Sequence, residues 1–223
     1  MNLDETAVGH LLRIQEVIPA MERALADFSS GRVVQPTRVM LPVAEHQGFL
    51  GLMPAYTGTA LGTKLVAFYP HNTDVPTHHA TILLFKPETG EPLATMDGRL
   101  ITEVRTAAVS AVATECLATP NASVLGIIGS GVQARSHLEA LRLVRDFGEV
   151  RVWSPNRSVE FARERGVHAA ASAKEAVQGA GVVVTATTSQ TPVLCGDGAA
   201  RTSTESATNT AAIGSVTKMV GLP

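Results

Sequence analysis

Two glycines and an alanine follow a short apolar stretch in "VLGIIGSGVQA", at a spacing that suits phosphate binding. Gly129, Gly131 and Ala134 satisfy the pattern G-x-G-x-x-A. In that pattern the first glycine makes a tight turn, the second lets a pyrophosphate approach the backbone, and the third small residue packs helix on strand. The N–H groups and dipole of the following helix then face the phosphates. The surrounding strand–helix–strand unit favours a dinucleotide site over an ordinary tight turn.

The next expected strand ends in "VWSPNRS", which has no carboxylate where an NAD site would hold the ribose 2′-hydroxyl. Ser154, Asn156 and Arg157 instead offer a hydroxyl, an amide and a guanidinium. Arginine makes charge-assisted, bidentate bonds to phosphate, so the segment favours NADPH over NADH. A polar surface turn is the alternative interpretation.

Basic residues in the first half of the chain are candidates for substrate chemistry. Lys64 lies inside the apolar stretch "GTKLVAFYP", where it either takes part in a substrate site or points to solvent from a half-exposed sheet. Arg105 is expected in the first turn of a helix, where a cation opposes the helix dipole and suggests a bound anion. His78 and His79 are adjacent in an expected strand and point to opposite faces, so no metal site is expected.

The elements that must position these residues change in character near residue 120. Residues 7–31 have helical spacing that ends at Gly31, and four apolar runs between residues 33 and 87 read as strands of a mainly antiparallel or mixed sheet. Residues 88–98 are expected as a hairpin-like connection. Residues 101–118 are expected as a helix that Thr102 caps.

After a linker at residues 119–123, strands and helices alternate along the chain. Such alternation predicts a parallel sheet with helices on its faces, as in a doubly wound nucleotide-binding fold. The expected strands are 123–129, 149–153, 167–170 and 181–188, and the expected helices are 132–147, 158–166 and 172–180.

Composition excludes several classes of function. The 223 residues carry a formal net charge of −2, and their basic residues are scattered without interleaved aromatics, so no nucleic-acid partner is expected. Cys116 and Cys195 are too few and too far apart for a disulfide framework or a paired zinc motif. The beginning "MNLDETAVGH" is typical of neither a signal peptide nor a membrane span, so a cytoplasmic protein without membrane association is expected.

Several ordered blocks together resemble the ornithine cyclodeaminase/mu-crystallin family, with the best match to its mu-crystallin (ketimine reductase) branch. They are "QPTRVMLPV", "GLMPAY", "TKLVAFYP", "VPTHHATILLF", "ATMDGRLITEVRTAAVSAVAT" and "LGIIGSGVQARSH". The resemblance implies an α/β protein that forms a homodimer. Residues 1–118 would be a mixed-sheet lobe for substrate binding and dimerisation. Residues 119–223 would be a truncated Rossmann lobe that binds NADPH and is irregular from about residue 196.

The same resemblance implies an activity and roles for particular residues. The mu-crystallin-like branch uses NADPH to reduce the C=N bond of small cyclic imino acids such as 1-piperideine-2-carboxylate, and it binds thyroid hormone. Arg38 and Arg105 match the arginines that bind the substrate carboxylate, and Lys64 matches the lysine beside them. Arg38 also matches the residue that contacts the carboxylate of the hormone. Lys64 and Arg105 are the expected catalytic residues. Thr77 and His78 match the nicotinamide side, whereas Gly129, Gly131, Val132 and Gln133 match the phosphate loop.

The chain departs from its family after Cys195. Members are longer and carry an S-x-x-P-D-x-x-E-L-like segment, whose aspartate acts at the substrate amine in the cyclodeaminases. Here "NTAAIGSV" resembles the next Rossmann strand, but no Pro-Asp follows, so the C-terminal part is missing or altered. A non-catalytic protein that binds NADPH or thyroid hormone, in the manner of crystallins, is therefore an alternative. Ornithine cyclodeaminase ranks lowest, because it needs that aspartate and, with NAD, an acid where Ser154 stands.

Overall fold

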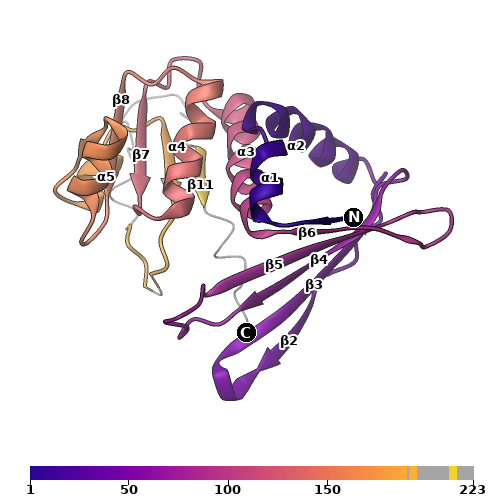
Figure 1. Cartoon of the computed structure of the whole chain (residues 1–223). Helices are drawn as coiled ribbons and strands as arrows, with labels where there is room; N and C mark the ends of the chain where they lie inside the picture. The colour runs from indigo at the N-terminus through magenta and orange to yellow at the C-terminus, as the bar shows by residue number, and fades with distance from the viewer. Residues whose placement is uncertain (190, 195–210, 215–223) are drawn as a thin grey trace. The chain divides into compact units, whose positions relative to one another are not determined.

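The computed structural model describes residues 1–189, 191–194 and 211–214, and it divides into two compact units (Figure 1). The first unit is Met1–Arg105 and the second begins at Thr106. The first is built on a mixed six-stranded sheet and the second on a parallel five-stranded sheet, which confirms the predicted α/β class. The division falls within helix α3 (Arg99–Leu117), whereas the sequence-based boundary between residues 118 and 119 lies at the end of that helix.

The sheet of the first unit has the strand order β1-β6-β5-β4-β3-β2. Strands β2 to β6 form an antiparallel meander, and β1 pairs with β6 in parallel. A short 3-10 turn, η1 (Ala44–His46), joins β2 to β3. The strands are β1 (Asn2–Leu3), β2 (Val39–Val43), β3 (Gly48–Tyr56), β4 (Leu61–Phe68), β5 (His78–Phe85) and β6 (Pro92–Asp97).

The expectation of a hairpin-like connection at residues 88–98 is right for residues 88–91, which join the antiparallel strands β5 and β6, but it missed that the rest of the segment is β6 itself. Residues Pro92–Asp97 pair with β5 on one side and with β1 on the other. The N-terminal residues Asn2 and Leu3 pair with Thr95 and Met96, so the chain's first residues complete the sheet. Strand β6 is thus specified by its two neighbours, one of them nearly a hundred residues away, rather than by an apolar run of its own.

Two helices precede the meander, as the helical spacing predicts. They are α1 (Glu5–Leu11) and α2 (Ile14–Ser29). The side chain of Asp4 caps α1 by accepting a hydrogen bond from the Ala7 N–H at 2.8 Å. Gly31 follows α2 with a φ of +74°, a left-handed conformation that favours glycine and ends the helix as predicted.

Helix α3 begins at Arg99, earlier than predicted, and this changes two expectations. The Asp97 carboxylate accepts a hydrogen bond from the Arg99 N–H at 2.9 Å, whereas the Thr102 N–H donates to the Gly98 carbonyl. Thr102 is therefore inside the helix and does not cap it. Arg105 lies in the second turn, so the argument from a cation in the first turn is wrong.

The second unit has the strand order β11-β10-β7-β8-β9, with every pair parallel. Strand β7 is buried on both faces, and the fully buried side chains of this unit include Leu125, Ile127, Leu138, Val152 and Val184. The strands are β7 (Val124–Ile128), β8 (Glu149–Trp153), β9 (His168–Ala169), β10 (Val182–Thr185) and β11 (Ala211–Gly214). The helices between them are α4 (Val132–Val144), α5 (Ser158–Arg165) and α6 (Ala173–Val177).

The strand order contains a switch point beside β7. From β7 the chain moves outward through β8 to β9, then returns to place β10 on the other side of β7. Ligands of doubly wound sheets bind at the carboxyl ends of the strands at such a point. The loops after β7, β8 and β10 are therefore where a ligand-binding site of this unit is expected.

The predicted irregular segment from about residue 196 lies outside the described residues, apart from Ala211–Gly214. Those four residues form β11 beside β10, in agreement with the similarity of "NTAAIGSV" to a further Rossmann strand. Among the helices in the described part of the chain, none is long and apolar enough to span a membrane.

Candidate functional site: a dinucleotide loop and a cluster of cations

The turn between β7 and α4 requires glycine at position 129. Gly129 has a φ of +115°, and its N–H donates to the Trp153 carbonyl at 2.8 Å. A Cβ at this position would lie 2.1 Å from the carbonyl oxygen of Ala186, so no other residue fits without moving the backbone. The loops after β7 and β10 therefore approach each other closely here, at the switch point.

The N-terminus of α4 is open to a ligand. Gly131 is its N-cap residue and provides no side-chain hydrogen bond, which leaves the first N–H groups of the helix available to an anion. A Cβ on Gly131 would have no atom within 4 Å, so the backbone there faces open space. Ala134 is fully buried and Val132 is 44% exposed. The Gln133 side-chain oxygen is buried without a hydrogen-bond partner among the described residues. These residues fit the pyrophosphate of a dinucleotide.

Serine hydroxyls tie the end of β8 to this loop. Ser154 Oγ lies 2.9 Å from Ser130 Oγ, and the Ser154 N–H donates to Ser158 Oγ at 2.7 Å. Arg157 lies at the N-cap of α5, and its guanidinium bonds the carboxylate of Glu160. The structure thus brings Ser154 and Arg157 into one short turn beside the phosphate loop, and Asn156 is exposed in the same turn.

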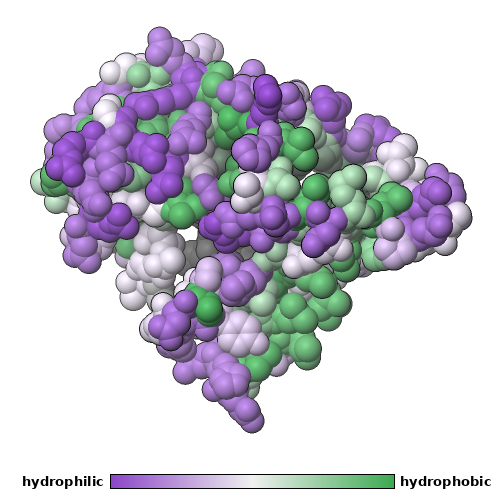
Figure 2. Space-filling view, in the orientation of Figure 1, coloured by the Kyte–Doolittle hydropathy of each residue, from purple (hydrophilic) through white to green (hydrophobic). Residues whose placement is uncertain are grey.

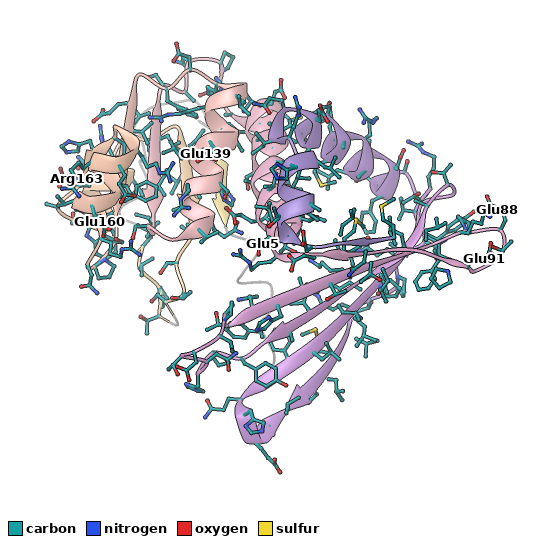
Figure 3. All side chains as sticks on the ribbon, in the orientation of Figure 1. Glu5, Glu88, Glu91, Glu139, Glu160 and Arg163 are labelled. Atoms are coloured by element: carbon teal, nitrogen blue, oxygen red, sulfur yellow. The ribbon has the colours of Figure 1, made fainter. Side chains whose placement is uncertain are left out.

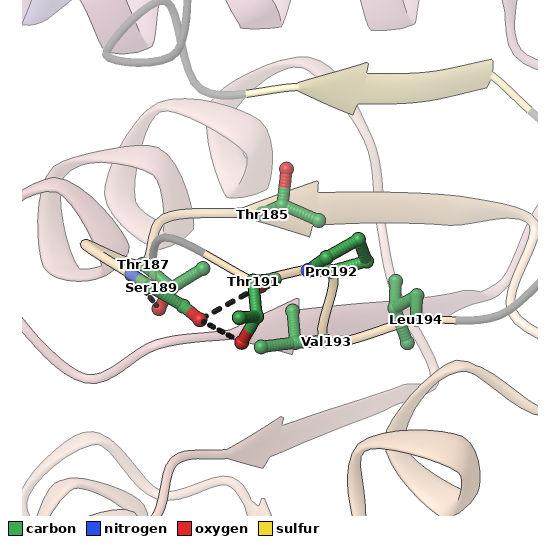
Figure 4. Close-up of a pocket in the computed structure, with 7 residues that line it drawn as sticks. All are labelled: Thr185, Thr187, Ser189, Thr191, Pro192, Val193 and Leu194. Carbon is green, nitrogen blue, oxygen red and sulfur yellow. Dashed lines mark hydrogen bonds between the residues drawn. The ribbon is translucent and has the colours of Figure 1, made fainter.

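A small pocket lined by hydroxyl groups lies in the loop after β10 (Figure 4). Its volume is about 200 Å³, and Ser189 Oγ donates to the Thr191 carbonyl at 2.8 Å in its wall. Sequence reasoning did not single out these residues, although threonines directly after a buried strand of a parallel sheet are a usable signal. The lining residues are Thr185, Thr187, Ser189, Thr191, Pro192, Val193 and Leu194.

Three cations gather on one face of the first unit. Lys64 lies opposite Met53 across the β3–β4 ladder, and Val39 lies opposite Leu52 in β2–β3. Arg38 precedes Val39, so it continues the same row as Met53 and Lys64. Burial, then the charges of Arg105 and Arg38, lower the pKa of Lys64 to about 8.

Arg105 completes this cluster from helix α3. Burial of its side chain, then the charge of Arg38, lower the pKa of Arg105. Like charges concentrated in a half-buried position repel one another, and an anion would relieve that repulsion. The arrangement therefore suits a carboxylate. The structure brings together the three residues that the sequence proposed for substrate binding.

Thr77 and His78 belong to the same unit as this cluster, and His78 is close enough to Lys64 for the charge of that lysine to affect it. The Thr77 carbonyl accepts from the Tyr69 N–H at 2.9 Å, and the His78 ring centroid is 4.5 Å from that of Phe68. Burial, then the charges of His79 and Lys64, lower the pKa of His78. His78 and His79 lie opposite Phe68 and Ala67, on alternate faces of the sheet. No group of three or more candidate metal ligands gathers within the described residues.

Comparison with known proteins identifies the family. A profile of the ornithine cyclodeaminase/mu-crystallin family matches residues 1–200, which is most of the chain. The chain belongs to this family. Within the ornithine cyclodeaminase/mu-crystallin family it is 48% identical over 204 residues to the ketimine reductase mu-crystallin of Mus musculus, covering 86% of this chain and 65% of the mouse protein. The chain thus spans less than two thirds of that relative.

Solved structures of similar proteins agree with the family and with its nucleotide-binding fold. The Thermococcus litoralis Δ1-pyrroline-2-carboxylate reductase, solved with NADH and L-proline, is 36% identical with a TM-score of 0.82, covering 89% of this chain and 65% of its own. An archaeal alanine dehydrogenase dimer with bound NAD is also 36% identical, with a TM-score of 0.83, and the match covers 89% of this chain and 64% of the dehydrogenase chain. Both relatives hold a nicotinamide dinucleotide.

Proposed function

We propose that this chain uses NADPH to reduce the C=N bond of small cyclic ketimine carboxylates, of which 1-piperideine-2-carboxylate is the representative substrate. The observation that carries the proposal is the cluster of Arg38, Lys64 and Arg105, in which Arg38 and Lys64 share a cross-strand row and the pKa of Lys64 is lowered to about 8. The identity to a ketimine reductase and to a pyrroline-2-carboxylate reductase supports it.

The two arginines would hold the substrate by its carboxylate. Guanidinium groups bind carboxylates with charge-assisted, bidentate hydrogen bonds, which fix the orientation of the bound molecule. In a cyclic ketimine carboxylate the imine carbon carries that carboxylate, so Arg38 and Arg105 would also fix the reacting bond. Such positioning supplies much of the rate of a reaction between two bound molecules.

Lys64 would supply the proton. Reduction of C=N requires a hydride at carbon and a proton at nitrogen, and the nicotinamide supplies the hydride when it is bound. With a pKa of about 8, Lys64 is mostly protonated at neutral pH but releases its proton more readily than an ordinary lysine. It would therefore protonate the imine nitrogen or keep it protonated, although the positive charges of the two arginines disfavour an iminium in this site.

The choice of NADPH rests on the end of β8. Arg157 and Ser154 lie in the turn where the ribose 2′-position of a bound dinucleotide is expected, and Asn156 adds an exposed amide. The turn contains no carboxylate to hold a free 2′-hydroxyl. Thr77 and His78 are proposed for the nicotinamide side, and the pocket after β10 for a ribose of the cofactor.

A homodimer is proposed for the active form. The archaeal alanine dehydrogenase was solved as a dimer, and the sheet of the first unit exposes large apolar side chains, including Val39 at 60% and Leu41 at 56%. Figure 2 shows hydrophobic surface gathered over the strands of this sheet. Exposed apolar surface of this kind is typical of a protein interface.

Carboxylate binding without turnover is the second candidate. The cluster of Arg38, Lys64 and Arg105 would hold the carboxylate of thyroid hormone as readily as that of a ketimine, because both ligands present the same group. Under this candidate the hormone would compete with the ketimine and would bind a chain that oxidises no NADPH.

The deciding experiment follows NADPH oxidation by the folded, purified chain with 1-piperideine-2-carboxylate. Turnover that saturates in the ketimine supports the reductase, and Arg105→Ala should abolish saturation while NADPH binding persists. Absence of turnover by a folded chain that binds NADPH would favour the binding protein. Unchanged saturation in Arg105→Ala would contradict the carboxylate site.

A further inference from the structure

We propose that Glu160 sets the preference of this chain between NADPH and NADH, by competing with the 2′-phosphate for the guanidinium of Arg157. The inference rests on the proposed NADPH site and adds to it a residue that sequence reasoning did not include. It concerns one ion pair on the surface of the second unit.

The ion pair has two hydrogen bonds. Arg157 Nε lies 3.0 Å from Glu160 Oε2, and a terminal nitrogen of the same guanidinium lies 3.3 Å from Oε1. The hydrogen bonds from Arg157 lower the pKa of Glu160, which is therefore ionised at neutral pH. The side chains are 63% and 46% exposed, and Figure 3 shows Glu160 projecting from α5.

The backbone around Arg157 is held independently of this pair. The Arg157 N–H donates to Ser154 Oγ at 3.3 Å, and Ser158 Oγ donates to the Ser154 carbonyl at 2.7 Å. These bonds fix the turn, whereas the guanidinium extends from it on a flexible stem. In the part of the chain that the structure describes, the hydrogen bonds of that guanidinium go to Glu160.

A carboxylate and a phosphate bind the same edges of a guanidinium. Glu160 occupies the edge formed by Nε and one terminal nitrogen, which suits bidentate binding of either group. An incoming 2′-phosphate would displace the carboxylate or share the guanidinium with it, and a phosphate monoester carries about −1.5 to −2 charges that Glu160 repels. NADH has a hydroxyl there and leaves the pair intact. Glu160 should therefore weaken binding of NADPH and leave binding of NADH unchanged.

The test is the dissociation constant of each cofactor, measured by fluorescence titration for the unmodified chain and for Glu160→Gln. We expect Glu160→Gln to bind NADPH roughly two- to fivefold more tightly at low salt, with NADH unchanged, since exposed ion pairs are weak. The gain should diminish at high salt. Glu164→Gln is the matched control, because Glu164 is on the same helix and acts on Arg157 through charge without a hydrogen bond.

Three outcomes would overturn the inference. The first is unchanged NADPH affinity in Glu160→Gln. The second is weaker NADPH binding in Glu160→Gln, as expected if Glu160 holds Arg157 in place for the phosphate. The third is a gain in NADPH affinity in Glu164→Gln equal to that in Glu160→Gln. A failure of the proposed role of Glu160 can be distinguished from a failure of the NADPH site with Arg157→Gln. This substitution should weaken the binding of NADPH but not of NADH, and in the double variant Glu160→Gln should then have no effect. An unchanged ratio of NADPH to NADH affinity in Arg157→Gln would contradict the NADPH site itself.

Discussion

The Nε2 atom of His137 lies 3.0 Å from the hydroxyl of Ser110, and both side chains are buried. His137 Nδ1 lies 2.7 Å from the Gln133 carbonyl, which can only accept, so Nδ1 carries the proton and Nε2 accepts from Ser110. This bridge connects α3 to the first turn of α4, where the phosphate loop ends. It is a neutral histidine whose hydrogen bonds are both made inside the protein.

The pH dependence of stability should reveal His137. Burial lowers its pKa in the folded chain, so below about pH 6.5 the unfolded chain binds a proton that the folded chain does not. The free energy of unfolding should therefore fall as pH decreases, by at most about 1.4 kcal/mol per pH unit from this residue. Denaturant titrations at a series of pH values should show a shallower fall of the unfolding free energy in His137→Gln than in the unmodified chain. An unchanged slope in His137→Gln would contradict the assignment.

The rate of reduction should depend on the protonation of Lys64. If Lys64 supplies the proton, kcat/KM should decrease as pH rises through about 8, where Lys64 loses its charge. Lys64→Met should reduce kcat/KM roughly 10²- to 10⁴-fold, and Lys64→Arg should move the decrease to higher pH. Because the substrate's own titration is common to all variants, rate profiles of the variants isolate the lysine. Lys86→Met, which removes an exposed lysine paired with Glu91, is the control.

Gly129 and Gly131 should respond differently to alanine. Gly129→Ala meets the Ala186 carbonyl in a left-handed conformation, so it should destabilise the fold by more than about 2 kcal/mol. Gly131→Ala enters open space and should leave the melting temperature unchanged while it weakens NADPH binding roughly tenfold, since its methyl group crowds the pyrophosphate. Thermal melts and cofactor titrations distinguish the two. Full NADPH affinity in Gly131→Ala would argue against the predicted phosphate position.

The start of α3 depends on Asp97. Asp97→Ala removes the acceptor for the Arg99 N–H and should cost about 1 kcal/mol of stability. Asp97→Asn keeps an acceptor oxygen and should lose less. Thr102→Val serves as the contrast, because Thr102 is within the helix. A larger loss in Thr102→Val than in Asp97→Ala would indicate that the helix begins at the later, sequence-predicted position.

The fold was predictable where a segment carries its own pattern. The runs at 48–56 and 149–153 coincide with β3 and β8, because the first is an apolar segment, the second alternates valine with charged residues, and turn residues bound both. Strand β6 was missed, since Pro92 and Asp97 weaken its strand pattern and its pairing with β1 is a long-range property. The helix start was missed because the capping side chain belongs to that unrecognised strand.

The site was predictable where backbone geometry restricts residue type. Only glycine suits the turn at Gly129, so the spacing of the motif is informative from the sequence alone. Arg105 was proposed partly from a wrong position in its helix, although it does join the cluster around Lys64. Glu160 was not selected from the sequence, although the predicted helix at 158–166 begins where α5 does, because its hydrogen bonds to the Arg157 guanidinium depend on side-chain conformations that the sequence does not specify.

Helix α3 belongs to both compact units, and this bears on how the protein can be dissected. A fragment that started at Thr106 would begin in mid-helix, without the Asp97 carboxylate that organises the first turn. A fragment that ended at Arg105 would carry a two-turn stub of the helix and lose Ser110. Proteolysis or gene splitting at that division should therefore leave this helix incomplete in both pieces, so a fragment meant to keep the helix intact has to include residues 99–117 as a whole.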